Sequence, residues 1–125
     1  MIEIIGNPKL ESKSSIKQIA DDCIKRLNID NKRIVEIIFV DRAKIQQLNF
    51  NHRKIDRPTD VLSFPQTKIN SDKQILGSIV ICEEIAEELG EIDGALVQHG
   101  LIHLLGYDHE TDKHQWQEVE NTLKH

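Results

Sequence analysis

The residues best suited to catalysis in this chain are three histidines near its end, His99, His103 and His109. His99 and His103 are four positions apart, so on a helix they lie on one face with about 6 Å between their Cβ atoms. That separation lets both imidazoles bind one metal ion at roughly 2.0–2.1 Å. Gly106 stands where the helix must end and the chain reverse, because glycine adopts a left-handed backbone at little steric cost. The spacing predicts a three-histidine site in which His109 approaches from the side and one coordination position stays open for catalysis.

The ligand types favour zinc, and they also allow nickel or another divalent ion. Three neutral imidazoles leave the ion its full double positive charge, which lowers the pKa of bound water toward ~7. Such a site provides hydroxide at neutral pH and a Lewis acid for a phosphoryl or carbonyl oxygen. A single histidine on an apolar helix is more often a hydrogen-bonded core residue, but two buried imidazoles need two sets of partners. The cluster therefore predicts a metal-dependent hydrolase.

The spacing H-x-x-x-H-x-x-G-x-x-H is similar to that of the metzincin metalloproteases, with one departure. Those enzymes carry Glu directly after the first His, where it acts as general base. The residue here is Gly100, which has no side chain to accept a proton. This difference argues against a peptidase. A zinc hydrolase of peptides or small molecules stays an alternative, because a base can come from elsewhere in the chain.

The composition is that of one soluble domain. With 125 residues, 30% of them charged and 38% hydrophobic, the chain predicts a single metal-dependent hydrolase domain over residues 1–125. Nothing resembles a signal peptide, and no apolar stretch approaches the ~20 residues needed to cross a bilayer. Cys23 and Cys82 lie far apart in apolar contexts and are expected to be buried reduced thiols. We therefore expect a cytoplasmic protein with no membrane partner.

The charge is unevenly distributed. A formal net charge of −5 argues against an extended nonspecific track for nucleic acid. A basic segment and an acidic run nevertheless stand out: Arg42, Lys44, Arg53, Lys54 and Arg57, against Glu83, Glu84, Glu87, Glu88, Glu91 and Asp93. The basic segment indicates either a focused anionic ligand or one of two solvated helix faces of opposite sign. Arg53 is the best candidate to bind a phosphate, because a guanidinium offers two parallel hydrogen bonds; a surface pair with Asp56 is the alternative.

The pattern of apolar residues predicts strands and helices in the order β-α-β-α-β-β-α-α-α. A first helix capped by Ser14 or Ser15, a second capped by Asp41 and a buried one capped by Asp93 are the clearest. Residues 51–57 are polar without a period and are expected to form a loop. The fold class is α+β (α/β-like), with a mixed sheet of about four strands packed against helices. The metal site would lie on the buried C-terminal helix and the following turn.

Three segments together resemble one known family. They are His99–His109, read as H-G-x-L-H-L-x-G-Y-D-H; Leu48–Arg53 leading into Pro58–Pro65; and Gly77–Cys82. These segments are similar to the signatures of the YbeY-type endoribonucleases, bacterial factors for ribosomal RNA maturation and quality control. They cover about half of the chain, in the family's order and at suitable distances.

The resemblance implies zinc bound by His99, His103 and His109. It also implies a metal-dependent, single-strand-specific endoribonuclease that helps to mature small-subunit rRNA, with Arg53 contributing to catalysis. The implied partners are single-stranded RNA or rRNA and the ribosome or ribosomal proteins, and no DNA is expected. The neighbours Lys54 and Arg57 would hold the phosphate with Arg53.

Two positions depart from the family pattern. Ile102 replaces the usual leucine inside the buried helix, and Ser78 stands where the family commonly has Asp. The aromatic content of 4% offers few platforms for base stacking, so recognition is expected to rely on the backbone and on partners. A ribosome-associated RNA-binding protein with structural zinc is the remaining alternative, although structural zinc usually has four protein ligands and no fourth is evident.

Overall fold

The computed structural model describes residues 2–29, 33–65 and 75–106, together with residues 114, 117–118 and 120–121. The last helix expected from the sequence therefore falls mostly outside the described residues, although those five are helical. Among the described residues, no helix is long and apolar enough to cross a membrane. The elements, in chain order, are β1 (Ile2–Ile5), α1 (Lys13–Arg26), β2 (Ile34–Phe39), α2 (Arg42–Arg53), β3 (Val61–Pro65), β4 (Ile75–Ile81), α3 (Glu83–Glu88) and α4 (Asp93–Leu104).

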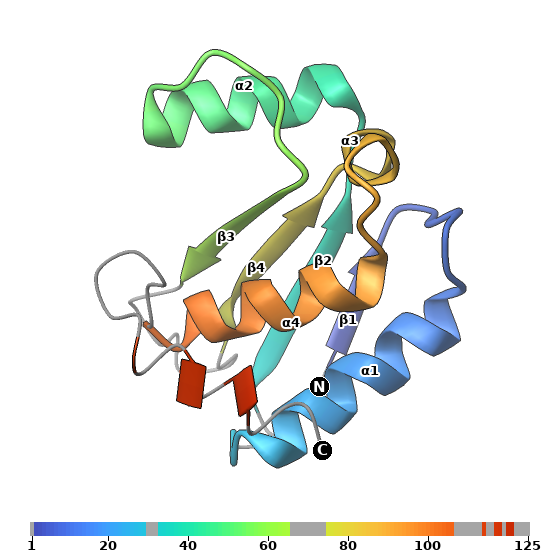
Figure 1. The fold of residues 1–125 in the computed structure, drawn as a ribbon, viewed down its shortest axis with the longest axis vertical. Helices are drawn as coiled ribbons and strands as arrows, with labels where there is room; N and C mark the ends of the chain where they lie inside the picture. The colour runs from blue at the N-terminus through green and yellow to red at the C-terminus, as the bar shows by residue number, and fades with distance from the viewer. Residues whose placement is uncertain are drawn as a thin grey trace.

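The four strands form one mixed sheet in the order β1-β2-β4-β3 (Figure 1). β1, β2 and β4 run parallel, and β3 pairs with β4 as an antiparallel edge strand, with Val61 opposite Ile81. The antiparallel pairing fits the chain length, because the stretch between Pro65 and Ile75 is shorter than the dozen or so residues that a parallel crossover needs. The sheet and its helices confirm the predicted α+β class.

The helices bury apolar residues on both faces of the sheet. α1 and α4 pack side by side on one face, over a core that includes Ile37, Ile79 and Leu101. Figure 1 shows α4 lying across this face. α2 covers part of the opposite face, where Ile45 packs with Leu62 in a second cluster. Successive strand residues point to opposite faces, so β3 contributes side chains to both layers.

Three helix boundaries differ from those predicted. α1 is capped by Ser12, whose Oγ accepts a hydrogen bond from the Ser15 amide at 3.1 Å. α2 is capped by Asp41 as predicted, but it continues to Arg53. The sequence did not predict this last turn, because it faces solvent and carries no apolar stripe. α4 begins at Asp93 with Ile92 as its N-cap, and Asp93 makes no capping hydrogen bond.

Candidate metal centre and substrate cleft

His99 and His103 face one another across one turn of α4. Their Nε2 atoms are 3.1 Å apart, and their ring centroids are 4.7 Å apart. Two nitrogens bound at 2.0–2.1 Å to one tetrahedral ion are separated by about 3.4 Å. The two imidazoles are therefore already arranged as neighbouring ligands of a single ion. The donor set fits the predicted metal.

α4 ends where the sequence predicts, at the turn that contains Gly106. α4 ends at Leu104, and Gly106 follows with a φ of +93°. The Gly106 amide donates to the His103 carbonyl at 2.9 Å, which closes the helix end. His109 lies outside the described residues. Within the described part of the chain, no group of three or more metal-ligating side chains could hold an ion.

Gly100 lies against the sheet. A Cβ at this position would be 2.7 Å from Cγ2 of Ile79 on β4. The Gly100 carbonyl accepts a hydrogen bond of 3.4 Å from Ser63 Oγ on β3. A glutamate at residue 100 would thus point into the sheet, and it could not serve the histidines as the base of a metalloprotease does.

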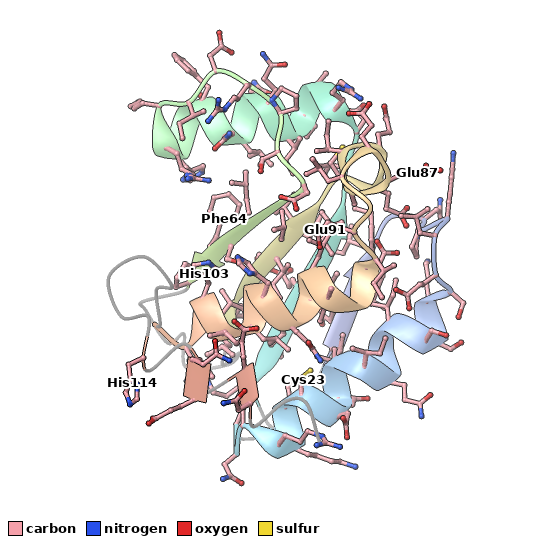
Figure 2. The ribbon with its side chains drawn as sticks, viewed as in Figure 1. Cys23, Phe64, Glu87, Glu91, His103 and His114 are labelled. Atoms are coloured by element: carbon pink, nitrogen blue, oxygen red, sulfur yellow. The ribbon has the colours of Figure 1, made fainter. Side chains whose placement is uncertain are left out.

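A cleft of about 560 Å³ opens beside the two histidines. It runs along the edge strand β3, between α4 and the last turn of α2. In Figure 2 the His103 side chain points from α4 toward the side on which Phe64 lies. The cleft is lined by His52, Arg53, Thr59, Asp60, Val61, Leu62, Ser63, Phe64, Pro65, His99 and His103.

Arg53 is the predicted cation that reaches this cleft. The alternative partner, Asp56, accepts a hydrogen bond from Gln46 Nε2 at 3.0 Å, and no described residue forms an ion pair with Arg53. At the other end of α2, Arg42 instead pairs with Glu84 Oε2 of the acidic run, at 3.8 Å. Within the basic segment, Arg42 therefore joins α2 to α3, whereas Arg53 faces the cleft.

The other two predicted cations lie outside the lining of the cleft. Lys54 ends α2 in a left-handed conformation, and its Nζ is 6.0 Å from the centre of the Phe50 ring. Arg57 is exposed on the segment that returns from α2 to β3. Of the six predicted site residues, three line one cleft: Arg53, His99 and His103. Lys54 and Arg57 follow Arg53 in the chain and do not line this cleft, and His109 lies outside the described residues.

Several lining residues were not predicted as site residues. The ring of His52 lies 4.5 Å from that of Phe64, centre to centre, with a 58° tilt. Asp60 Oδ1 accepts hydrogen bonds from the Val61 amide at 2.9 Å and from Thr59 Oγ1 at 3.2 Å. A signal for them was present, since they adjoin Arg53 or lie in the segment from Pro58 to Pro65, but nothing in their types showed which would face the histidines.

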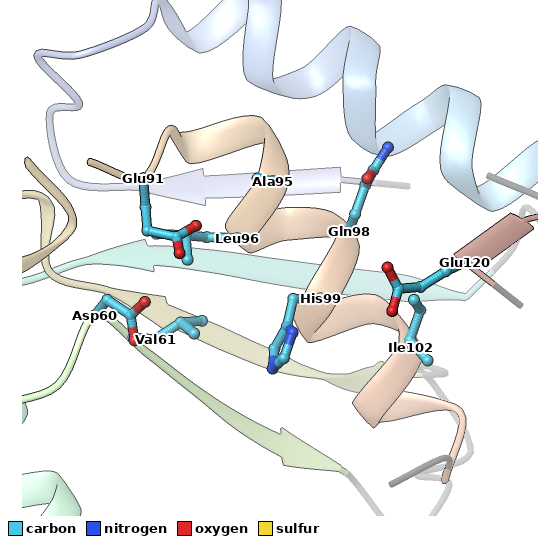
Figure 3. Close-up of a pocket in the computed structure, with 9 residues that line it drawn as sticks. All are labelled: Asp60, Val61, Glu91, Ala95, Leu96, Gln98, His99, Ile102 and Glu120. Atoms are coloured by element: carbon cyan, nitrogen blue, oxygen red, sulfur yellow. The ribbon is translucent and has the colours of Figure 1, made fainter. Parts of the chain in front are cut away.

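A second, smaller cleft of about 380 Å³ lies on the other side of His99. Figure 3 shows His99 between Asp60 on one side and Glu120 on the other. Glu91 also lines this cleft, so its ionisable groups are mostly carboxyls. Arg53 lines only the first cleft, Glu91 and Glu120 line only the second, and Asp60 lines both. A phosphate is therefore attracted toward Arg53 and repelled from the end of the second cleft that holds Glu91 and Glu120.

Two buried groups away from the clefts have shifted titrations. Cys23 is free, and burial raises the pKa of its thiol to about 11, so it stays protonated and unreactive near neutral pH. Cys82 is also free and buried, as expected. Burial, together with repulsion from the nearby carboxyls of Glu83 and Glu11, raises the pKa of Asp93 to about 7. These buried groups lie outside both clefts, so we expect them to affect the stability of the fold rather than catalysis.

Comparison with known proteins identifies the family. The sequence model described as Endoribonuclease YbeY matches residues 5–124. The chain belongs to the endoribonuclease YbeY family. The endoribonuclease YbeY of Aquifex aeolicus is 38% identical over an alignment of 120 positions, which covers 87% of this chain and 79% of that protein. The Sulfurimonas denitrificans relative of the same name is 43% identical over an alignment of 113 positions, which covers 84% of this chain and 75% of that protein.

A solved structure supports the same assignment. The solution structure of a Thermotoga maritima protein is similar with a TM-score of 0.59 and 28% identity, covering 99% of this chain and 87% of that one. The mixed sheet and its helices are thus shared with a protein determined by experiment. Membership of the YbeY family confirms the resemblance read from the histidine signature.

Proposed function

We propose that this protein is a zinc-dependent, single-strand-specific endoribonuclease acting in small-subunit rRNA maturation and ribosome quality control. Its membership of the endoribonuclease YbeY family supports RNA as the substrate. The observation that carries the proposal is the shared cleft, in which Arg53 lines the same space as the facing imidazoles of His99 and His103. A phosphate-binding cation and a metal-binding pair thus meet at one surface.

In the proposed reaction the chain's own residues bind and orient the RNA. Arg53 holds the scissile phosphate through its guanidinium, and Lys54 and Arg57 attract the neighbouring phosphates. His99, His103 and His109 would hold the metal ion, which would supply Lewis-acid chemistry at a phosphoryl oxygen. The carboxyls of Glu91 and Glu120, which line only the second cleft, keep the phosphate on the Arg53 side of the histidines.

The shape and composition of the cleft favour a flexible single strand. The cleft is lined by residues of α2, β3 and α4, and it is partly open to solvent. A single strand can bend to bring one phosphate to Arg53, whereas the phosphates of a duplex are held by base pairing. The tilted rings of His52 and Phe64 offer a small apolar surface for a neighbouring base.

Two further parts of the proposal concern context. We place the enzyme in the cytoplasm, with the ribosome or ribosomal proteins as partners, because two buried free thiols suit a reducing compartment. We also propose that residues 1–125 act as one hydrolase domain, which the family match over residues 5–124 supports. The peptidase alternative is disfavoured, because Gly100 packs against Ile79 and supplies no carboxylate at the position where the metalloproteases carry their general base.

The decisive experiment measures cleavage of a labelled single-stranded RNA by the purified protein, with and without chelator, and after zinc is added back. A duplex of the same sequence and a denatured protein serve as parallel substrates. We expect cleavage of the single strand alone, lost with chelator and restored by zinc. Cleavage of the denatured protein and not of the RNA would instead support a peptide hydrolase.

His103→Ala is the key variant, and His114→Ala is its matched control. The side chain of His114 is 90% exposed and pairs with Glu118 at 3.0 Å, so its removal should change neither metal content nor cleavage. His103→Ala should lose bound zinc, measured by mass spectrometry, and cleavage with it. Equal cleavage by both variants would show a contaminating nuclease. Loss of the fold on chelation, followed by circular dichroism, would support a structural metal.

A further inference from the structure

Asn49 is a buried amide on α2, one turn before Arg53. Its side chain is only 2% exposed, although asparagine is usually a surface residue. It lies on the inner face of the helix, four positions after the fully buried Ile45 and four before Arg53. Asn49 therefore belongs to the same helix face that presents Arg53 to the cleft.

The amide of Asn49 holds the chain that returns from α2 to β3. Asn49 Nδ2 donates to the Arg57 carbonyl at 2.9 Å. The return begins at Lys54, whose φ of 60° turns the chain back, and Figure 1 shows it passing along α2 before it enters β3. A second, exposed tie joins Gln46 Nε2 to Asp56 Oδ1 at 3.0 Å. The contact made by Asn49 is the buried one of the two.

The cost of burying the Asn49 amide indicates that this side chain has a role other than stabilising the fold. Asn49 Oδ1 is buried, and no described group donates to it. A buried acceptor without a partner costs about 1–3 kcal/mol, whereas an apolar side chain of the same shape avoids that cost. A leucine, which is of similar size, would satisfy the packing around Ile45 at least as well. What only the amide provides is the hydrogen bond to the Arg57 carbonyl.

We propose that Asn49 is a positioning residue for the cleft. Its hydrogen bond to the Arg57 carbonyl fixes the path of residues 54–60. That path sets the distance between Arg53 on α2 and the wall of the cleft that begins with Thr59 and Asp60. Because that wall continues along β3 to the histidines, Asn49 sets where the phosphate held by Arg53 lies relative to His99. The proposal rests on the proposed RNA cleavage for its effect on activity.

The test is Asn49→Leu, with cleavage and amide hydrogen exchange measured on the same preparation. A displacement of about 1 Å at a reacting group can lower a rate by about 100-fold. We expect kcat to fall by about 10- to 100-fold while the midpoint of thermal unfolding and the zinc content stay unchanged. Amides of residues 54–60 should exchange faster, and those of α4 should not. Gln46→Ala, which removes the exposed tie, should keep kcat within about twofold.

Two outcomes would overturn the proposal: Asn49→Leu with unchanged kcat, or Asn49→Leu with unchanged protection of residues 54–60. If Asn49→Leu does not fold, Asn49→Ala removes the same donor without adding apolar bulk and is judged by the same criteria. The exchange measurement needs no activity. If the parent protein cleaves no RNA, the proposed function fails, while faster exchange confined to residues 54–60 would still support the role of Asn49.

Discussion

Gly100 on α4 and Ile79 on β4 are in contact so close that no side chain fits between them. A Cβ on residue 100 would lie 2.7 Å from Cγ2 of Ile79 and 2.9 Å from its Cδ1. Separations below 3.0 Å are essentially absent between real Cβ atoms and their neighbours. The glycine thus allows α4 to pack closely on the sheet. This packing places His99 and His103 beside the edge strand β3.

Gly100→Ala should destabilise the protein, although alanine is the better helix former. Forcing a methyl group into a filled contact costs about 1–3 kcal/mol, more than the gain of up to about 1 kcal/mol in helix propensity. Urea unfolding of the variant and the parent measures the difference. In an Ile79→Ala background the colliding atoms are gone, so the cost of Gly100→Ala should vanish. An equal cost in both backgrounds would contradict this contact as the cause.

Arg53→Lys should impair RNA cleavage although it keeps the charge. A lysine cannot form the two parallel hydrogen bonds of a guanidinium, and hydrogen bonds to charged groups contribute about 1.5–3 kcal/mol. We expect a fall of about 10- to 100-fold in kcat/KM, and a larger fall for Arg53→Ala. Arg26→Ala is the matched control, because Arg26 lies on α1 in an ion pair with Asp22 at 2.8 Å. Full activity of Arg53→Lys would reduce Arg53 to a general attractor of phosphates.

Asp93→Asn should stabilise the protein at pH 8. Asp93 is fully buried, and burial beside Glu83 raises its pKa to about 7, so the folded state binds the proton more tightly than the unfolded chain does. The parent therefore loses stability as the pH rises from about 4 to about 7, and the loss is complete above that range. At pH 8 the gain from Asp93→Asn should be on the order of 2–4 kcal/mol.

The pH dependence separates this effect from ordinary repacking. In urea unfolding, the advantage of Asp93→Asn should shrink to less than about 1 kcal/mol at pH 4, where the carboxyl is protonated in the folded state and about half protonated in the unfolded chain. Glu91→Gln, which removes an exposed acid from the same connection, should show no such trend. A pH-independent gain from Asp93→Asn would mean that the carboxyl of Asp93 is not titrating in this range.

Ser78→Asp should destabilise the sheet without abolishing cleavage. Ser78 lies beside Ile79 on β4, so its side chain points to the face away from α4, where its Oγ donates to Glu36 Oε1 at 2.9 Å. An aspartate would oppose Glu36 as a like charge and lose this bond, at about 1–2 kcal/mol. Urea unfolding should show most of the cost removed by Glu36→Gln. Loss of cleavage in a folded Ser78→Asp would contradict this orientation.

Local rules accounted for much of the fold and for the metal-binding pair. Two histidines four apart on a helix must share a face, and Gly106 is a residue that can take the positive φ with which α4 closes. The order of strands and helices followed from apolar periodicity, since each element hides one face. These features depend on neighbours in the sequence, so the sequence alone predicts them.

The boundaries that were wrong depend on distant contacts. Asp93 has the side chain of a helix cap, yet it is buried inside the first turn of α4, against Glu83 and Glu11 from other segments. α2 continues through polar residues to Arg53, because Asn49 and the returning chain close around its end. Neither arrangement has a local signature.

The sequence by itself determined the ligand types, the helix that carries two of them, the fold class and the family resemblance. Only the tertiary structure decided that Arg53 shares a cleft with His99, that Gly100 faces Ile79, and that Ser78 lies on the opposite face of the sheet. The reason is physical: spacing along a helix follows from backbone geometry, whereas contacts between distant segments depend on how all the side chains of the core pack together.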